Sequence, residues 1–487
     1  MRYVFAAAAA VALATSLTVA SAQQAPDRSR APETGPPPVL KLPAIQKRQL
    51  SNGLPVWIVE LHEVPVVQAN LVVLSGSGDD PSGKFGVANL TAAMLVEGAG
   101  SRSALEIADA VDYLGADLTA NSSSDASAIR LHVPVARLAE ALPIMADVAQ
   151  RPTFPNDELM RLRAQRLTTV IQARDDPETI GQLAFSRVLY GTTHRYGTAQ
   201  AGSAQTIQSL TVDDVRSFYT AVYRPNNAAF IVVGDVTADR VMPLLETHFG
   251  KWQASGPAPQ HATLATPPMP AARRIYLVDK PGAPQTQIRI GWVAVPRSTP
   301  DFFPIQVMNT VLGGAFSSRL NLNLREKNGY TYGASSFFDM RLAAGPFVAA
   351  AGVQTDKTAE ALKEFFNELT AISQAVPADE LARAKHYVSL RFPSGFETTG
   401  DISTRLEQAV VYRLPDDYFS TYVQKIEAIT AADTQRVAQK YIQPNRLAVV
   451  VVGDRMVIEP GIRALNLGAI TVLTIEDVFG PAPVLSK

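Results

Sequence analysis

The chain of 487 residues has no cysteine, only 6 histidines and no excess of charge of either sign. The missing thiols exclude disulfide frameworks, thiolate metal sites and a cysteine nucleophile. Lys and Arg number 44 against 45 Asp and Glu, so the formal net charge is -1. Because the sequence carries no overall basic charge, we expect no nucleic-acid partner.

Long hydrophobic runs are also absent after residue 22, so we expect no membrane segment in the mature protein. Residues 1–22 begin with a single arginine, continue as a stretch rich in Ala, Val and Leu, and end in Ala20-Ser21-Ala22. This pattern is typical of a cleaved secretory signal, with a membrane anchor as the alternative. A secreted chain without cysteine is compatible with a bacterial periplasm, which is the location we predict.

Two proline-rich stretches divide the rest of the chain, a lead-in at 23–45 and a linker at 254–272. They delimit a first globular segment at 46–253 and a second at 273–470, followed by a tail at 471–487. Hydrophobic residues make up 47% of the sequence, which is enough for two sizeable cores.

The two segments end in the same pattern, with four positions repeated 219 residues apart: Thr211/Thr430, Asp214/Asp433, Pro225/Pro444 and Gly234/Gly453. In each copy a threonine precedes an acidic residue by three positions, as in a helix capping box, and a Val- and Ile-rich run predicts a buried strand. The repeat predicts a duplicated domain. Helix-like and strand-like segments are mixed in both copies, among them a strand expected at 55–60 and a long charged helix expected at 157–174. We therefore predict an α+β fold with two homologous sheet-and-helix domains in tandem.

Several short motifs carry a family resemblance: Asn52-Gly53-Leu54, Gly76-Ser77-Gly78-Asp79-Asp80, Gly83-Lys84-Phe85-Gly86-Val87-Ala88, Arg224-Pro225-Asn226 and Val233-Gly234-Asp235. Together they make the sequence similar to the pitrilysin/insulinase superfamily of zinc peptidases, and to its short, processing-peptidase-type members in particular. The resemblance spans about 46–470. It implies that the two domains close like a clamshell around a cavity.

Active members of this superfamily carry a His-x-x-Glu-His motif, in which two histidines one helical turn apart bind zinc and the glutamate takes a proton from the bound water. Aligned on that motif, Asn89 and Ala93 stand at the histidine positions and Ala92 at the glutamate position. The third ligand, a glutamate in a later helix, falls near Thr169. Methyl groups neither bind a metal nor move a proton, so we predict no metal or cofactor in this chain and no complete catalytic set.

The second segment keeps a different family pattern, Arg-Glu-Lys-x-Gly-x-x-Tyr, at 325–332. The resemblance assigns Arg325 and Tyr332 to substrate contact near the scissile bond. A guanidinium offers fixed donors to a peptide carbonyl or carboxylate, and a phenol can donate to an oxygen that gains negative charge. Without the family pattern, Arg325 would be an ordinary surface residue and Tyr332 a packed strand aromatic.

This combination resembles the non-catalytic subunit of a heterodimeric zinc metallopeptidase, inactive alone, whose homologous partner subunit binds the zinc. The chain would contribute Arg325 and Tyr332 to the partner's cavity for peptide degradation or processing. The alternative is a structural or peptide-binding homologue with no catalytic partnership. An independent serine hydrolase is the weakest interpretation, because no Gly-x-Ser-x-Gly elbow is present.

Overall fold

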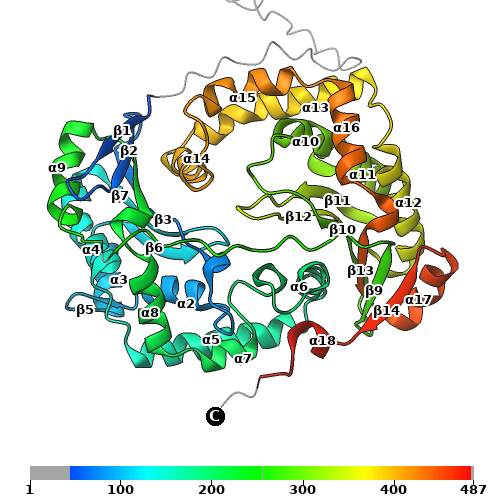
Figure 1. Cartoon of the computed structure of the whole chain (residues 1–487), viewed down its shortest axis with the longest axis horizontal. Coiled ribbons are helices and arrows are strands. Elements are labelled where there is room, and N and C mark those ends of the chain that lie inside the picture. The colour runs from blue at the N-terminus through cyan, green and yellow to red at the C-terminus, as the bar shows by residue number, and fades with distance from the viewer. Residues whose placement is uncertain (1–43, 255, 484–487) are drawn as a thin grey trace, which may run out of the picture. The chain divides into compact units, whose positions relative to one another are not determined.

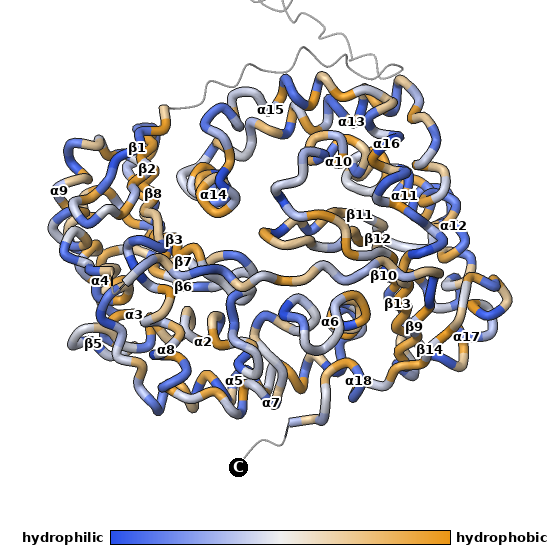
Figure 2. Tube along the Cα trace, in the orientation of Figure 1, coloured by the Kyte–Doolittle hydropathy of each residue, from blue (hydrophilic) through white to orange (hydrophobic). Residues whose placement is uncertain are grey.

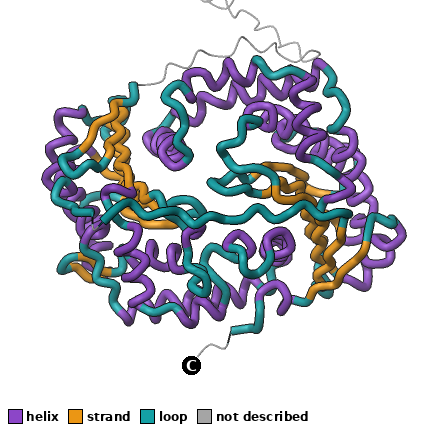
Figure 3. The backbone as a smooth tube through the Cα atoms, viewed as in Figure 1, coloured by secondary structure: helices purple, strands orange, loops and turns teal. Residues whose placement is uncertain are grey.

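The computed structural model describes residues 44–254 and 256–483, which contain both repeats. The expected signal at 1–22 and nearly all of the lead-in at 23–45 lie outside the described residues. Within the described part, no helix is both long and apolar enough to cross a membrane. Figure 1 labels the helices and strands, and Figure 3 colours them by type.

Each repeat builds one six-stranded mixed sheet. The first has the order β1-β2-β8-β3-β7-β6 and comprises β1 Gln46–Gln49, β2 Pro55–Glu60, β3 Val66–Val73, β6 Asp117–Ser122, β7 Ser127–Pro134 and β8 Ala228–Gly234. The second has the order β11-β12-β10-β13-β9-β14 and comprises β9 Arg274–Asp279, β10 Gln285–Val293, β11 Thr331–Phe338, β12 Pro346–Gln354, β13 Ala448–Gly453 and β14 Ala469–Leu473. A small ribbon joins β4 Gly98–Ala99 to β5 Arg102–Ser103.

The two sheets have the same internal order, because β2-β8-β3-β7-β6 corresponds to β9-β13-β10-β12-β11. Strands β2 and β9 begin 219 residues apart, at 55 and 274, and so do β3 and β10, at 66 and 285. Strand β8 lies parallel to β2 and antiparallel to β3, and β13 repeats this with β9 and β10. Both expected capping boxes, Thr211/Asp214 and Thr430/Asp433, are formed. The predicted α+β fold with two homologous domains is confirmed.

Helices flank both sheets. Those of the first repeat are α2 Val87–Met94, α3 Ala104–Tyr113, α4 Leu138–Gln150, α5 Asn156–Ala173, α6 Pro177–Tyr190, α7 Ala204–Ser209, α8 Val212–Val222 and α9 Ala238–Phe249. Those of the second are α10 Phe302–Asn309, α11 Arg319–Asn321, α12 Thr358–Ala371, α13 Ala378–Arg391, α14 Thr399–Val411, α15 Tyr418–Glu427, α16 Ala431–Tyr441, α17 Arg455–Ala464 and α18 Ile475–Phe479. Two π-helical turns, Thr310–Gly314 and Leu322–Lys327, extend α10 and α11.

One helix of each repeat packs on the sheet of the other. Helix α6 contacts β10 and β13, and its Ile180 and Phe185 belong to the second repeat's core. Helix α14 contacts β3 and β8, and its Leu406 belongs to a cluster with Val59 and Ile231 of the first sheet. Figure 2 shows apolar residues along β13 and α14. Two of the hydrophobic clusters therefore cross the division of the chain at 254–272, whereas the large cluster of the first repeat lies wholly before it.

The segment expected to be a tail, 471–487, continues the second repeat as far as residue 483. Strand β14 pairs in parallel with β9 at the edge of the second sheet. Helix α18 then contacts α6, and its Val478 and Phe479 are buried in the same core.

Candidate functional site

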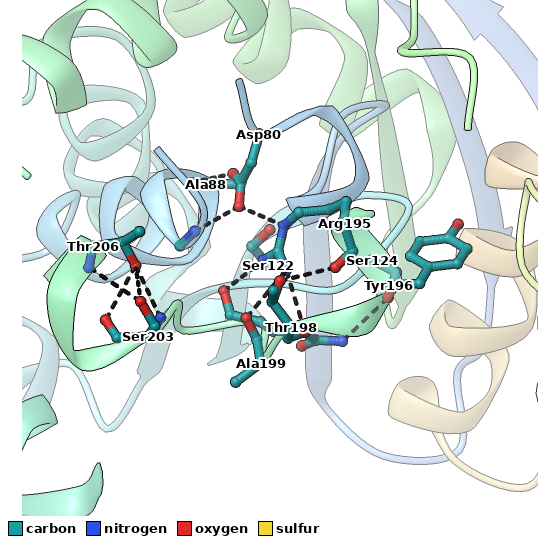
Figure 4. Close-up of polar contacts among 12 residues, drawn as sticks. Asp80, Ala88, Ser122, Ser124, Arg195, Tyr196, Thr198, Ala199, Ser203 and Thr206 are labelled. Carbon is teal, nitrogen blue, oxygen red and sulfur yellow. Dashed lines mark hydrogen bonds and ion pairs between the residues drawn. The ribbon is translucent and has the colours of Figure 1, made fainter. Parts of the chain in front are cut away.

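Helix α2, which carries Asn89, Ala92 and Ala93, begins at a buried ion pair. The Asp80 carboxylate accepts hydrogen bonds from the backbone N–H groups of Gly86 (2.7 Å) and Ala88 (2.8 Å), so it caps the helix. Arg195 Nε lies 2.8 Å from Asp80 Oδ2, with both side chains almost fully buried (Figure 4). Burial raises the pKa of Asp80, and the charge of Arg195 and the two N–H groups oppose that rise.

Arg195 also organises the loop that follows it. Its guanidinium donates to the carbonyl oxygens of Ala199 (3.1 Å) and Gln200 (2.9 Å) and to the Thr198 hydroxyl (2.7 Å). The loop packs tightly on the start of α2, because a Cβ at Gly86, where φ is +103°, would lie 2.4 Å from the Ala201 carbonyl oxygen. The ion pair therefore fixes α2 and this loop together.

A cavity of about 540 Å³ lies between these elements. Helices α2, α5, α6 and α7 and the loop 195–203 contribute its wall, and both Asn89 and Thr169 line it. Ala92 is 1% exposed and does not line it, nor does the half-buried Ala93. The fold thus brings two of the four degenerate motif positions to one cavity, although they lie on different helices.

The side chains at these positions do not fit a zinc ion. An asparagine, two alanines and a threonine replace the ligands and the base, and Arg166 Nη2 donates to the Asn89 carbonyl oxygen at 3.1 Å. A guanidinium repels a divalent cation. No group of three or more His, Asp or Glu in residues 44–254 and 256–483 could hold a metal ion. Four histidines instead contact separate partners, namely His62, His132, His194 and His261. His194, for example, caps a short helix by accepting from Tyr196 N.

Sequence reasoning missed the arginines of this cavity. Arg166, Arg187, Arg195 and Arg341 all line it, and no aspartate or glutamate does among the described residues. Arg195 is paired with Asp80, and Arg341 Nε lies 3.0 Å from Asp339 Oδ2. One signal was readable, because Arg166 precedes Thr169 by three positions and shares its face of a helix. The other three depend on contacts between distant segments.

Arg325 and Tyr332 do not line this cavity, and neither residue belongs to a hydrophobic core. The Arg325 guanidinium carbon lies 4.6 Å from the centroid of the Phe316 ring, and Nε lies 3.3 Å from Glu326 Oε1. Tyr332, at the start of β11, is 87% exposed, so its phenol is accessible. Gly329, with φ of +66°, follows the π-helical turn Leu322–Lys327 that carries Arg325, and it precedes Tyr332 by three positions.

The fold and this site define a duplicated, peptidase-like chain without metal ligands at its motif positions. The family model for insulinase (peptidase family M16) matches residues 56–199, and the model for the peptidase M16 inactive domain matches 209–388. The chain belongs to peptidase family M16, the pitrilysin/insulinase superfamily, and is a member that lacks the His-x-x-Glu-His motif and keeps the Arg/Tyr pair.

Relatives and solved structures agree with this assignment. An uncharacterized zinc protease of Mycobacterium bovis is 25% identical over 411 residues, which is 84% of this chain and 93% of that protein. The crystal structure of a peptidase M16 inactive domain from Pseudomonas fluorescens superposes with a TM-score of 0.77 at 27% identity, covering 84% of this chain and 98% of that one. The periplasmic protease PqqL of Escherichia coli shares the fold, with a TM-score of 0.71 at 17% identity over 91% of this chain and 51% of that one.

Proposed function

We propose that the chain is the non-catalytic, substrate-binding subunit of a heterodimeric zinc metallopeptidase. The observation that carries the proposal is the contrast between two sets of positions. Asn89, Ala92, Ala93 and Thr169 supply no metal ligand, whereas Arg325 and Tyr332 retain the family pattern and Tyr332 is 87% exposed. A side chain that contributes nothing to the core and remains accessible is suited to contact with a substrate.

In this proposal the zinc and the general base come from a homologous partner subunit, and this chain supplies donors. The Arg325 guanidinium, held over the Phe316 ring, binds a carbonyl or carboxylate of the peptide. The Tyr332 hydroxyl donates to the substrate oxygen on which negative charge develops. We also propose that residues 1–22 direct the chain to the periplasm, which the periplasmic location of the similar protease PqqL supports.

The test mixes the mature protein with the zinc-motif homologue encoded by the same organism. Complex mass, peptide turnover and the zinc content of each chain are measured. We expect a one-to-one complex, zinc in the homologue only, and turnover above that of either chain alone. Arg325→Ala or Tyr332→Phe should lower turnover about 10-fold or more while assembly persists, as losing one transition-state donor does elsewhere.

Two matched controls come from the first repeat. Tyr113→Phe changes a tyrosine that is 78% exposed, and Arg240→Ala removes an exposed arginine of α9. Both should leave turnover unchanged. If Arg325→Ala and Tyr332→Phe also leave turnover unchanged, the proposed role of these two residues is refuted. Stoichiometric zinc in this chain would refute the assignment of a non-catalytic subunit.

The alternative, a peptide-binding protein with no catalytic partnership, also has an observation in its favour. The chain contains a cavity of about 540 Å³ of its own, apart from Arg325 and Tyr332. Peptide binding by a chain that never accelerates its zinc-bearing homologue would favour this alternative.

A further inference from the structure

Two of the four arginines in the cavity have no counter-charge. Arg195 and Arg341 form ion pairs with Asp80 and Asp339, but Arg166 and Arg187 form none with any described residue. Arg166 Nη1 and Arg187 Nε are both buried without a hydrogen-bond partner among the described residues. Most buried polar groups in proteins have a hydrogen-bond partner, so a donor without one calls for an explanation, of which a bound ion or ligand is one.

The charges of both arginines persist at neutral pH. Burial lowers the pKa of Arg166 to about 10 and lowers the pKa of Arg187 as well, because desolvation disfavours the charged form. The arginines sit on consecutive helices, Arg166 on α5 and Arg187 on α6, and both line the same cavity. A cavity with two positive charges and no acidic lining residue attracts an anion.

The rest of the lining limits what kind of anion fits. Val170, Leu183, Ile207 and Phe479 supply an apolar surface, and small polar residues such as Thr179 and Ser186 supply hydroxyl groups. A ligand with one carboxylate and an attached chain of mixed polarity would satisfy both parts. The planar guanidinium matches a carboxylate with two parallel hydrogen bonds.

We propose that this cavity binds a carboxylate of a peptide, with Arg166 and Arg187 as its cationic ligands. The inference deepens the proposed peptide-binding function and rests on it. Of the two arginines, Arg166 lies beside two of the metal-motif positions, because its Nη2 donates to the Asn89 carbonyl oxygen at 3.1 Å and it precedes Thr169 by three positions on α5. The carboxylate comes either from the peptide's C-terminus or from an Asp or Glu side chain.

The experiment measures fluorescence anisotropy of labelled hexapeptides with the purified mature protein at low and high salt. Four otherwise identical peptides have a free or an amidated C-terminus, each with a central Glu or Gln. We expect peptides with a carboxylate to bind with at least about 10-fold higher affinity than the amidated Gln peptide, because hydrogen bonds between charged groups are stronger than those between neutral groups. The carboxylate whose removal weakens binding identifies the source.

Substitutions of single arginines test which side chains cause the preference for a carboxylate. Arg166→Gln and Arg187→Gln should each reduce the preference for a carboxylate about 10-fold, and Arg166→Lys, which keeps the charge, should retain part of it. Arg240→Gln removes the same charge from an exposed position on α9 and should leave the preference intact. Thermal melting of each variant confirms folding, and the half-buried Arg187 provides the test if Arg166→Gln does not fold.

Equal affinity for all four peptides, or the same response to Arg166→Gln, Arg187→Gln and Arg240→Gln, would overturn the inference. Either result would leave the proposed function intact, provided that the turnover of the reconstituted pair still depends on Arg325 and Tyr332. Failure of the chain to bind any of the peptides would likewise overturn the carboxylate site, whereas failure of the pair to assemble or gain turnover would overturn only the partnership.

Discussion

Asp80 and Arg195 illustrate what a sequence reveals about single residues and what it does not. The stretch that contains Asp80 was recognisable as a family motif, and the structure gives it a physical role, the capping of α2. Its partner Arg195 lies 115 residues away, and no local pattern marks that residue as buried. Pairing between distant charges depends on the tertiary fold, so it could not be predicted from the sequence.

Asp301 provides a prediction at the residue scale. This carboxylate precedes α10 and is bound by three groups of α16: Arg436 (2.8 Å), Lys440 (2.9 Å) and the Tyr441 hydroxyl (2.5 Å). Burial alone would raise the pKa of Asp301, but hydrogen bonds from Tyr441, Lys440 and Arg436 outweigh it and lower the pKa to about 2. In the unfolded chain the pKa is about 3.9.

We expect Asp301→Asn to destabilise the protein by about 1–2 kcal/mol at pH 7, allowing for the partial screening of the two half-exposed cations. Because the folded-state pKa is the lower one, the unfolded chain takes up the proton first as the pH falls. The contribution of Asp301 to the free energy of unfolding is therefore complete above about pH 5 and disappears towards pH 2.

Urea unfolding at pH 7, 4 and 3 measures this difference between Asp301→Asn and the unchanged protein. Asp109→Asn, at an exposed carboxylate of α3 that forms no ion pair with a described residue, serves as the control and should change little at any pH. A destabilisation by Asp301→Asn that is the same at all three pH values would contradict the prediction.

At the scale of elements, regular patterns gave good predictions. The helix expected at 157–174 is α5, Asn156–Ala173, and the strand expected at 55–60 is β2. Short or irregular elements were not predicted, among them β14, which completes a sheet edge with a mostly exposed strand. Periodicity shows that a helix has an apolar face but not which sheet covers that face, so the exchange of α6 and α14 was also not predictable.

The packing of α14 leads to a prediction at the element scale. Leu406 of α14 is 1% exposed and belongs to the cluster with Val59 and Ile231 of the first sheet. Leu406→Ala leaves a cavity in that contact, so we expect a loss of about 2–4 kcal/mol in the free energy of unfolding. Urea denaturation measures it, and Leu105→Ala, at a leucine 76% exposed on α3, is the control. Equal effects of the two substitutions would show that α14 does not hold the first sheet.

At the scale of the whole molecule, contacts across the two repeats are both apolar and polar. Arg130 binds Glu407 of α14 through two hydrogen bonds of 2.8 and 2.6 Å. The buried Asp125 accepts from the Tyr412 hydroxyl at 3.1 Å and from Leu342 N at 3.0 Å. These contacts hold the repeats together independently of the segment 254–272 that joins them in the chain.

We therefore predict that the protein survives a cut in that segment. A protease site inserted between 256 and 260 should allow complete cleavage into two fragments that still elute as one species in size-exclusion chromatography. Each fragment expressed alone should aggregate, because the first lacks α14 and the second lacks α6, which leaves an apolar sheet face uncovered. Separation of the fragments after cleavage, or a soluble folded fragment on its own, would contradict this.

The exchange of helices also bears on how such a chain could arise. A single repeat that gave its helix to another copy's sheet and received one in return would be a domain-swapped dimer. Joining the two copies end to end through a proline-rich segment would preserve every contact of that dimer and produce the arrangement of α6 and α14. The arrangement of α6 and α14 is therefore that of a domain-swapped pair of repeats contained in one chain.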